Sequence, residues 1–281
     1  MSIMPATYLT RGVTFVTGGA RGLGNAVAVS FAKAGATGVV LVDIQGKEAM
    51  AEGAKNVESH GVECLTIQAD VSKETDVENA VAQAVSRFGR IDYAANFAGI
   101  GGQAGSIANY DVDNFRRVMD VNVTGSLLCM KYQMKQMLQQ DPIAMHLPDS
   151  ETGRVPQRGS IVNCASVNSI MASAYSAAYT ASKHAVAGLT KVAALEGRQH
   201  HIRVNTVSPG FLYTQLISNG LGPAGEAGET KWTELEARQG RSATFDEIGD
   251  AVVLLSSPRM SLLNAHNLVV DNGFTVNEMS S

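Results

Sequence analysis

Tyr179 and Lys183 stand four positions apart in a stretch whose apolar spacing predicts a helix, so their side chains share one helical face. A phenol is a poor base at neutral pH because it ionises at about pH 10. An ammonium ion ~4 Å away, at an effective dielectric constant of about 20, stabilises a phenolate by roughly 4 kcal/mol. That energy corresponds to lowering the pKa of a phenol by about three. The pair can therefore act as an acid/base couple. An isolated pair of this spacing is more often a surface tyrosine beside a solvated lysine.

Ser166 directly follows the apolar run 161–165, which predicts a strand, and it precedes Tyr179 in the chain. A hydroxyl at the end of such a strand can hold a substrate oxygen while Tyr179 moves the proton. Ser169 is a weaker candidate for the same role. Asn122 interrupts an otherwise apolar helical face, and a local kink is the plain reading of an asparagine there.

A glycine-rich turn, TGGARGLG from Thr17, places Gly18, Gly22 and Gly24 between a predicted strand and a predicted helix. The free N–H groups at a helix N-terminus suit a pyrophosphate, and glycines let the backbone approach it closely. Asp43 ends the next predicted strand, where a carboxylate can hold a ribose hydroxyl. By themselves the glycines fit a plain tight turn equally well.

The elements that must position these residues alternate regularly along the chain. Apolar runs predict strands over 13–16, 39–43, 64–70, 91–99, 159–166, 202–210 and 266–273. Helical spacing predicts helices over 25–34, 47–60, 75–88, 113–139, 177–196 and, shorter and charged, 232–239. This alternation predicts a single-domain α/β protein over residues 1–281, with a Rossmann-type doubly wound parallel sheet of about seven strands and helices on both faces.

Two segments interrupt the alternation. Residues 139–158 are polar and contain prolines, which predicts a surface insertion. Residues 211–240 follow a strand's C-terminal end and include a glycine-rich stretch, so we expect a region that covers the substrate.

Taken together, the motifs resemble the short-chain dehydrogenase/reductase family, and they span nearly the whole chain in the family's order. Phe97 is a departure, because the family more often has a second asparagine there. The matching pieces are TGGARGLG from Thr17, Asp43, Asp70 in QADVS, NFAG from Asn96, Asn122 in DVNVTG, Ser166 in NCAS, YTASK from Tyr179 and PGFLYT from Pro209.

The resemblance implies that Asn122 completes a catalytic tetrad with Ser166, Tyr179 and Lys183, and holds a water that links Lys183 to solvent. It also implies that Asp70 binds adenine, that Lys183 bonds the nicotinamide ribose, and that the PGFLYT segment seats the carboxamide. The expected cofactor contacts are Gly18, Ala20, Arg21, Gly22, Leu23, Gly24, Asp43, Ile44, Asp70, Val71, Asn96, Ala98, Gly99, Tyr179, Lys183, Pro209, Gly210, Leu212 and Thr214.

NAD is favoured over NADP, because a carboxylate at Asp43 repels a 2′-phosphate and the following Ile44 and Gln45 offer no cation. Arg21, just before Gly22, is the residue that could instead serve NADP. The apolar residues after Pro209 favour a bulky, mostly apolar alcohol or ketone, such as a steroid-, terpenoid- or polyketide-like compound of secondary metabolism. The expected substrate contacts are Ser166, Asn168, Tyr175, Tyr179, Phe211, Tyr213 and Leu216.

Composition narrows the class of protein. The 281 residues carry a net charge of −4 and no cluster of Lys and Arg, which argues against a nucleic-acid partner. No apolar run approaches the ~20 residues of a membrane span, and the N-terminus does not resemble a signal peptide. The three cysteines lie far apart, which argues against disulfides and a metal site. We therefore expect a cytoplasmic enzyme without a metal.

Two alternatives to an NAD-dependent secondary-alcohol dehydrogenase remain open. One is an NADPH-dependent carbonyl or enone reductase of the same fold, and the other is a non-catalytic NAD-sensing protein. The resemblance also implies a homo-oligomer, a dimer or a tetramer, assembled through the long helices on either side of the fifth strand.

Overall fold

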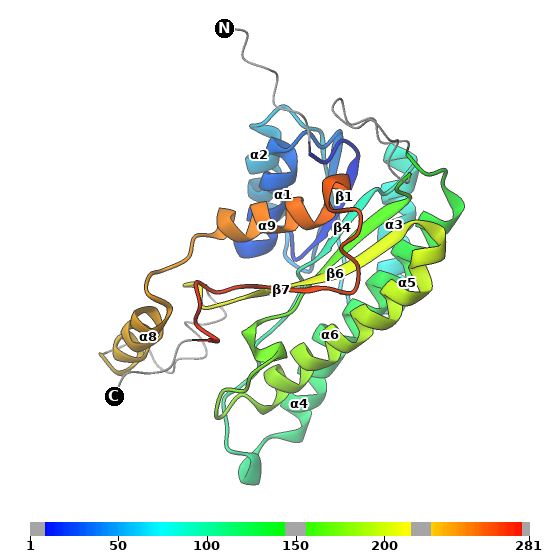
Figure 1. The fold of residues 1–281 in the computed structure, drawn as a ribbon. Helices are drawn as coiled ribbons and strands as arrows, with labels where there is room; N and C mark the ends of the chain where they lie inside the picture. Colours follow the sequence, from blue (N-terminus) through cyan, green and yellow to red (C-terminus); the bar gives the residue numbers. More distant parts are fainter. Residues whose placement is uncertain (1–8, 144–155, 215–225, 277–281) are drawn as a thin grey trace, which may run out of the picture.

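A parallel sheet forms the centre of the molecule in the computed structural model, which describes residues 9–143, 156–214 and 226–276. Within these residues seven strands lie in the order β3-β2-β1-β4-β5-β6-β7 (Figure 1). The order reverses between β1 and β4, which is the switch point of a doubly wound sheet. The predicted fold class is confirmed. The strands are β1 Val13–Thr17, β2 Gly38–Asp43, β3 Cys64–Gln68, β4 Tyr93–Asn96, β5 Gly159–Cys164, β6 Ile202–Pro209 and β7 Asn267–Val270.

Helices cover both faces of the sheet, each over its own hydrophobic core (Figure 1). One core joins the sheet to α1, α2 and α9, and the other joins it to α3, α5 and α6. Burial on both faces explains why β1, β2 and β6 are buried along their whole length. The helices are α1 Gly22–Lys33, α2 Lys47–Glu58, α3 Glu74–Phe88, α4 Val112–Met119, α5 Gly125–Gln139, α6 Ala177–Gly197, α8 Glu226–Gln239 and α9 Phe245–Ser256.

The long helix expected over 113–139 is not continuous. Residues Asp120–Thr124 form a π-helical turn between α4 and α5. The Ser126 hydroxyl donates to the carbonyl of Asn122 at 2.6 Å, within the helical backbone. A π turn bulges the backbone, and such turns occur often at functional sites. The kink expected at Asn122 is therefore present as this turn.

Helix α9 was missed by the sequence analysis, although its start carries a clear signal. Thr244 and Glu247 form a capping box, in which each side chain bonds the backbone of the other residue. The apolar residues that follow include Ile248, Val252 and Val253, which are buried against α1. Helix α8 was predicted, but it begins at Glu226 and is longer than expected.

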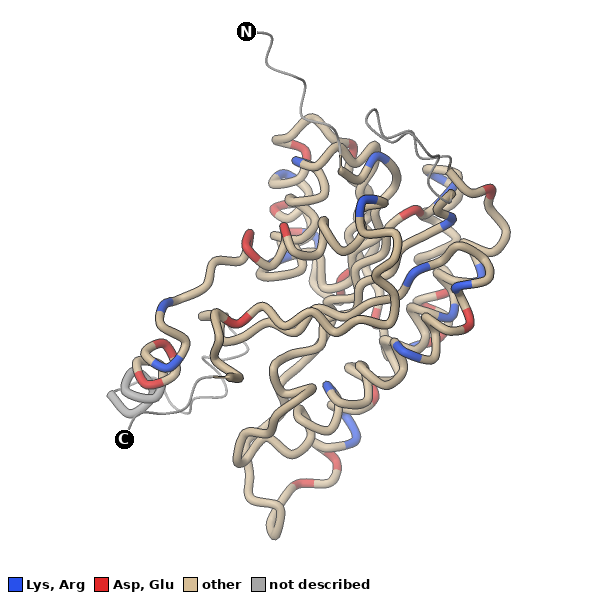
Figure 2. The backbone as a smooth tube through the Cα atoms, viewed as in Figure 1, with Lys and Arg blue, Asp and Glu red and all other residues tan. Residues whose placement is uncertain are grey.

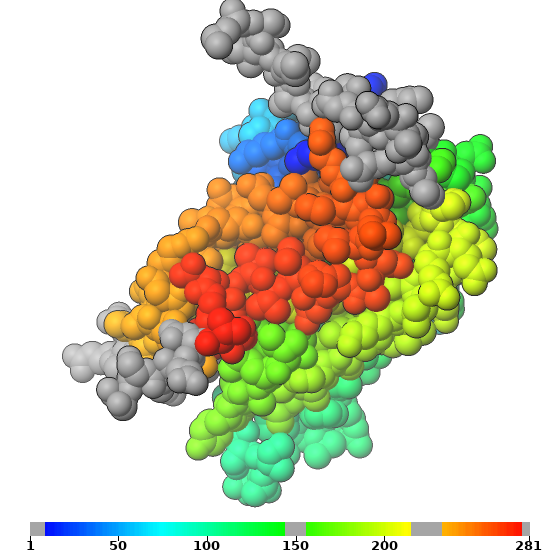
Figure 3. Space-filling model, in the orientation of Figure 1, coloured from blue at the N-terminus to red at the C-terminus, as the bar shows by residue number. Residues whose placement is uncertain are grey.

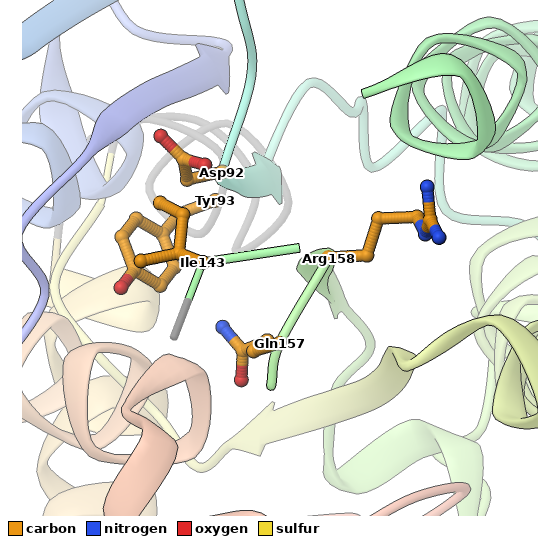
Figure 4. A pocket seen from close by; sticks show the side chains of 5 residues that line it. All are labelled: Asp92, Tyr93, Ile143, Gln157 and Arg158. Atoms are coloured by element: carbon orange, nitrogen blue, oxygen red, sulfur yellow. The ribbon is translucent and has the colours of Figure 1, made fainter. Parts of the chain in front are cut away.

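The polar segment 139–158 starts from the amino edge of the sheet. Ile143 and Gln157 pair as an isolated antiparallel bridge, and residues 144–155 lie outside the described residues. A small pocket beside this bridge is lined by Asp92, Tyr93, Ile143, Gln157 and Arg158 (Figure 4). Arg158 points away from Tyr93 and donates to the carbonyl of His200 at 3.1 Å.

Burial raises the pKa of the Asp92 carboxyl, which accepts from the Val13 amide and from Arg90. These bonds join chain segments at the base of the insertion.

Positions of Lys and Arg and of Asp and Glu are interspersed along the backbone of the helices (Figure 2). None of the described helices combines the length and the hydrophobicity that crossing a membrane requires.

Candidate active site

The candidate site lies at the carboxyl edge of the sheet, where β1, β4, β5 and β6 end side by side. Thr17 closes the gap between β1 and β4, because its hydroxyl accepts from the amides of Phe97 and Ala98 at 3.1 and 3.2 Å. Parallel strands bring their carboxyl ends to one edge, so residues distant in sequence meet there.

Lys183 is the central cation of this edge and is 5% exposed. Its ammonium nitrogen donates to the carbonyl oxygen of Cys164 at 2.8 Å and lies 5.4 Å from the centre of the Tyr179 ring. None of the ion pairs found among the described residues involves Lys183. Within the described residues, the hydrogen-bond acceptor found for this buried ammonium group is the neutral carbonyl oxygen of Cys164.

The Cys164 thiol does not compete as a nucleophile. Burial raises the pKa of this thiol, and the Lys183 cation opposes the rise without outweighing it. A thiol that stays protonated is a weak nucleophile. In the described residues no group of three or more His, Cys, Asp or Glu side chains could hold a metal ion.

Asn122 joins the π turn to two other segments of the site. Its amide oxygen accepts from the Ile100 amide at 2.8 Å, and its amide nitrogen donates to the Ile100 carbonyl at 2.9 Å and to Ser182 at 3.0 Å. The Ser182 hydroxyl in turn donates to the carbonyl of Tyr179 at 2.7 Å. Ser182 was missed by the sequence analysis, although it lies inside the YTASK motif. A Cβ on Gly99 would lie 3.2 Å from the Asn122 oxygen and 3.8 Å from the Lys183 nitrogen.

Ser166 and Ser169 differ in what their hydroxyls already do. Ser166 is 7% exposed, and its hydroxyl oxygen accepts from the backbone N–H of Asn168 at 3.2 Å. Ser169 shares hydrogen bonds with Ser208 at 2.9 Å and with Asn267 at 3.0 Å, so it links β6 and β7. The Ser166 oxygen can still donate its proton, whereas Ser169 belongs to a buried structural network. This contrast supports the choice of Ser166.

Asn168, expected at the substrate, is 5% exposed and its amide is engaged by the chain itself. It accepts from Ser173 at 3.2 Å and donates to Thr180 at 3.2 Å. These bonds fix the loop that leads into α6, and hence the position of Tyr179.

The glycine-rich turn between β1 and α1 requires its glycines. Gly18 has φ of +68°, and a Cβ there would lie 2.9 Å from the Ala98 amide nitrogen. A Cβ on Gly24 would overlap the carbonyl oxygen of Gly18. Gly22 has φ of +59° and has open space where its Cβ would stand. The turn is thus closed toward the protein and open at the N-terminus of α1, as a pyrophosphate cradle requires.

Asp43 ends β2 beside this turn and is 9% exposed. One carboxylate oxygen accepts from the Ala20 amide at 3.0 Å and the other from the Gln45 amide at 3.2 Å. Each oxygen retains a lone pair for a further donor, such as a ribose hydroxyl. The following Ile44 is 60% exposed, and Arg21 is exposed at the start of α1. The turn and Asp43 together fit the adenosine and pyrophosphate of a dinucleotide.

Asn96 and Asp70 are placed differently from each other. The side-chain amide of Asn96 is buried and bonded to Gln133 and Asn163, so it is engaged within the protein. Asp70 is partly exposed; it accepts from the Ser72 hydroxyl at 2.7 Å and pairs with Lys73 at 3.9 Å. Val71 follows as a buried core residue. The buried amide network of Asn96 was not anticipated.

The apolar residues expected around the substrate differ in how exposed they are. Tyr175 and Tyr213 are 66% and 63% exposed, and Tyr213 lies edge-on to Trp232 of α8 with ring centres 5.1 Å apart. Phe211 packs on Phe274 at 4.8 Å, which makes it part of a junction with the C-terminal segment. Leu212, expected at the cofactor, is 4% exposed and belongs to the α1-side core. Leu216 lies outside the described residues.

Comparisons with known proteins agree with this geometry. A family described as Enoyl-(Acyl carrier protein) reductase matches residues 18–275. A short-chain dehydrogenase of Aspergillus ruber, fogB, is 41% identical over 274 residues, which cover 96% of this chain and 98% of the relative. The chain belongs to the short-chain dehydrogenase/reductase family. It is therefore a member of a family of oxidoreductases that bind NAD(P).

Two further similarities extend across the chain. (+)-Borneol dehydrogenase 2 of Salvia officinalis is 34% identical over 282 residues and covers 97% of this chain, which spans 92% of that enzyme. The crystal structure of levodione reductase superposes with a TM-score of 0.83 at 32% identity, covering 95% of this chain and 98% of that one. The family resemblance read from the motifs is confirmed.

Replacing Gly24 by alanine tests the close approach of helix α1 to the Gly18 carbonyl in the glycine-rich turn. The new methyl group would overlap the Gly18 carbonyl, so we expect Gly24→Ala to lower the free energy of unfolding by about 2 kcal/mol or more. Gly188→Ala is the matched control, since this helical glycine of α6 has open space at its Cβ and should gain about 0.5–1 kcal/mol. Urea unfolding measures both, and equal stabilities would contradict the close approach.

Proposed function

We propose that the protein is an NAD(H)-dependent oxidoreductase that interconverts a secondary alcohol and a ketone. The observation that carries the proposal is the buried ammonium group of Lys183 beside Tyr179, with Ser166 at the end of the neighbouring strand. Asn122, Ser166, Tyr179 and Lys183 are the proposed catalytic residues.

The proposed chemistry divides between hydride and proton. Bound NAD supplies the acceptor for the hydride that leaves the alcohol carbon. Tyr179, as the phenolate, removes the hydroxyl proton, and the Ser166 hydroxyl donates a hydrogen bond to the substrate oxygen. Lys183 stabilises the phenolate, and Asn122 fixes the π turn and the Ile100 backbone beside it. In the reverse direction Tyr179 returns the proton.

The proposed cofactor is NAD, because the carboxylate of Asp43 at the end of β2 would repel the 2′-phosphate of NADP. Gly18, Gly22 and Gly24 would hold the pyrophosphate, and the Pro209–Gly210 turn with Thr214 would seat the carboxamide. An NADPH-dependent enone reductase is the second candidate, since the matching family is described as an enoyl reductase. The carboxylate of Asp43 is the observation against it.

The proposed substrate is bulky and mostly apolar. Tyr175, Tyr213 and Ile170 are exposed at the carboxyl edge of the sheet and offer aromatic and aliphatic surface. Among the similar proteins are a borneol dehydrogenase and a levodione reductase, which supports a cyclic alcohol or ketone. We propose that the described parts of 211–240 cover this substrate.

We also propose a homo-oligomer, a dimer or a tetramer. Helices α5 and α6 expose leucine and valine side chains on their outer surface. These are Leu127, Leu138, Val192 and Leu195, each 44–56% exposed. Exposed apolar side chains on the outer surfaces of two helices favour association of two copies.

Removing the phenol oxygen tests the chemistry. We expect Tyr179→Phe to lower kcat for NAD reduction by a secondary alcohol by about 100-fold or more, because the proton acceptor is lost. Ser166→Ala should also reduce kcat, whereas Ser169→Ala should not, since its hydroxyl is committed to Ser208 and Asn267. Absorbance at the NADH band measures turnover. A Tyr179→Phe enzyme with wild-type kcat would reject the mechanism.

Replacing the carboxylate at the end of β2 tests the cofactor. Asp43→Asn keeps an oxygen for the Ala20 amide but removes the negative charge. We expect its affinity for NADPH, relative to NADH, to rise about tenfold or more, because the repulsion of the 2′-phosphate is lost. Fluorescence titration with the two reduced cofactors measures the ratio. A wild-type protein that already prefers NADPH would favour the enone reductase.

Replacing Tyr175 tests the proposed substrate surface. Its φ of +66° is a conformation that costs a non-glycine residue roughly 1–2 kcal/mol, so a glycine there relieves backbone strain. Tyr175→Gly should leave thermal stability unchanged or higher, and should raise KM for a polycyclic alcohol more than for a small one. His201→Gly relieves a similar φ of +60° at the start of β6 and is the control. Equal KM changes for both alcohols would remove Tyr175 from the substrate site.

A further inference from the structure

Gln239, the last residue of α8, is 2% exposed and forms a paired contact with the backbone of Phe211. Its amide oxygen accepts from the Phe211 amide at 2.7 Å, and its amide nitrogen donates to the Phe211 carbonyl at 2.9 Å. The same nitrogen also donates to the Arg241 carbonyl at 3.1 Å. Every polar atom of the side chain is therefore satisfied within the protein.

Three chain segments converge on this residue. Gly210 lies at the end of β6, where a Cβ would overlap the Gln239 oxygen and lie 2.9 Å from the Asp271 Cβ. Asn272, just after β7, donates to the Gln239 carbonyl at 2.7 Å. Phe274 is 1% exposed and packs on Phe211. The red C-terminal residues lie against the orange α8–α9 region in Figure 3. The ends of β6, α8 and β7 thus form one closely packed junction.

A glutamine at this position is informative, because an apolar side chain would satisfy both burial and helix propensity. Burying an amide is unfavourable unless its donor and acceptor are both paired. Here the amide binds the N–H and the C=O of a single residue, and this pairing fixes the orientation of the Phe211 peptide groups. Gly210, which immediately precedes Phe211, belongs to the turn that we propose as the carboxamide seat.

We propose that Gln239 is the positioning residue through which α8 fixes the Pro209–Phe211 turn, so that the substrate side and the cofactor seat depend on each other. The inference rests on the proposed function. Trp232, two turns before Gln239 on α8, contacts Tyr213 of the proposed substrate surface. One helix therefore carries both the contact to the substrate side and the contact to the turn. A ligand that shifts either end changes the affinity at the other.

Cofactor affinity is the primary test. Trp232 is the single tryptophan of the chain, so energy transfer from Trp232 to bound NADH reports binding without turnover. We expect Gln239→Leu to raise the Kd for NADH about tenfold, because two hydrogen bonds that hold the turn are lost. Gln139→Leu, the same change at an exposed end of α5, is the control and should bind NADH as the wild type does.

A conservative variant separates positioning from simple packing. In Gln239→Glu an ionised carboxylate can accept from the Phe211 amide but cannot donate to its carbonyl. The protonated acid can do both, and burial favours the protonated form. We expect the NADH affinity of Gln239→Glu to improve between pH 8 and pH 6, relative to the wild type over the same range. A role in packing alone predicts instead that the apolar Gln239→Leu binds NADH as the wild type does.

The outcomes are distinguishable. Unchanged NADH affinity in Gln239→Leu, or no pH-dependent recovery in Gln239→Glu, would overturn the inference and leave the proposed function standing. If Gln239→Leu does not fold, the pH dependence of Gln239→Glu decides. A wild-type protein that binds neither NADH nor NADPH would overturn the proposed function and this inference together. With an active wild type, a larger rise in KM for polycyclic than for small alcohols in Gln239→Leu is the expected kinetic result.

Discussion

The buried ammonium group of Lys183 constrains the carboxyl edge of the sheet, where the candidate site lies. A cation in a protein interior is unfavourable unless polar groups face it, and here the Cys164 carbonyl at the end of β5 meets this need. That bond fixes α6 against β5, and Tyr179 lies one turn earlier on the same helix. Asn122 and Ser182 hold the preceding segments to α6 in turn. The arrangement of the candidate site thus depends on how one buried charge is accommodated.

Close backbone approaches form the second constraint, and they occur at both ends of the proposed cofactor site. Gly18 and Gly24 allow β1, α1 and the end of β4 to meet without side chains between them. Gly210 allows the ends of β6, α8 and β7 to meet in the same way. The proposed dinucleotide and substrate sites lie between these junctions.

The residues missed from the sequence have a common cause. Ser182 and Gln239 are unremarkable polar residues in helices until their partners are known, and those partners lie 60 and 28 positions away. The π turn at Asn122 could be anticipated only as a kink, because its form depends on bonds to Ile100 and Ser182. Helix α9 is different, because the capping box of Thr244 and Glu247 is a local sequence pattern that predicts the start of a helix.

The sequence by itself indicated the alternation of strands and helices and, through motifs that resemble a known family, Asn122, Ser166, Tyr179 and Lys183 as the candidate tetrad. These features are local, because burial sets the period of apolar residues and motifs have fixed spacing. Tertiary structure alone decided that Ser169 and the Asn96 amide are committed to internal networks, and that Gln239 holds Phe211. Hydrogen-bond partners across a parallel sheet depend on how distant strands align, and no local pattern encodes that alignment.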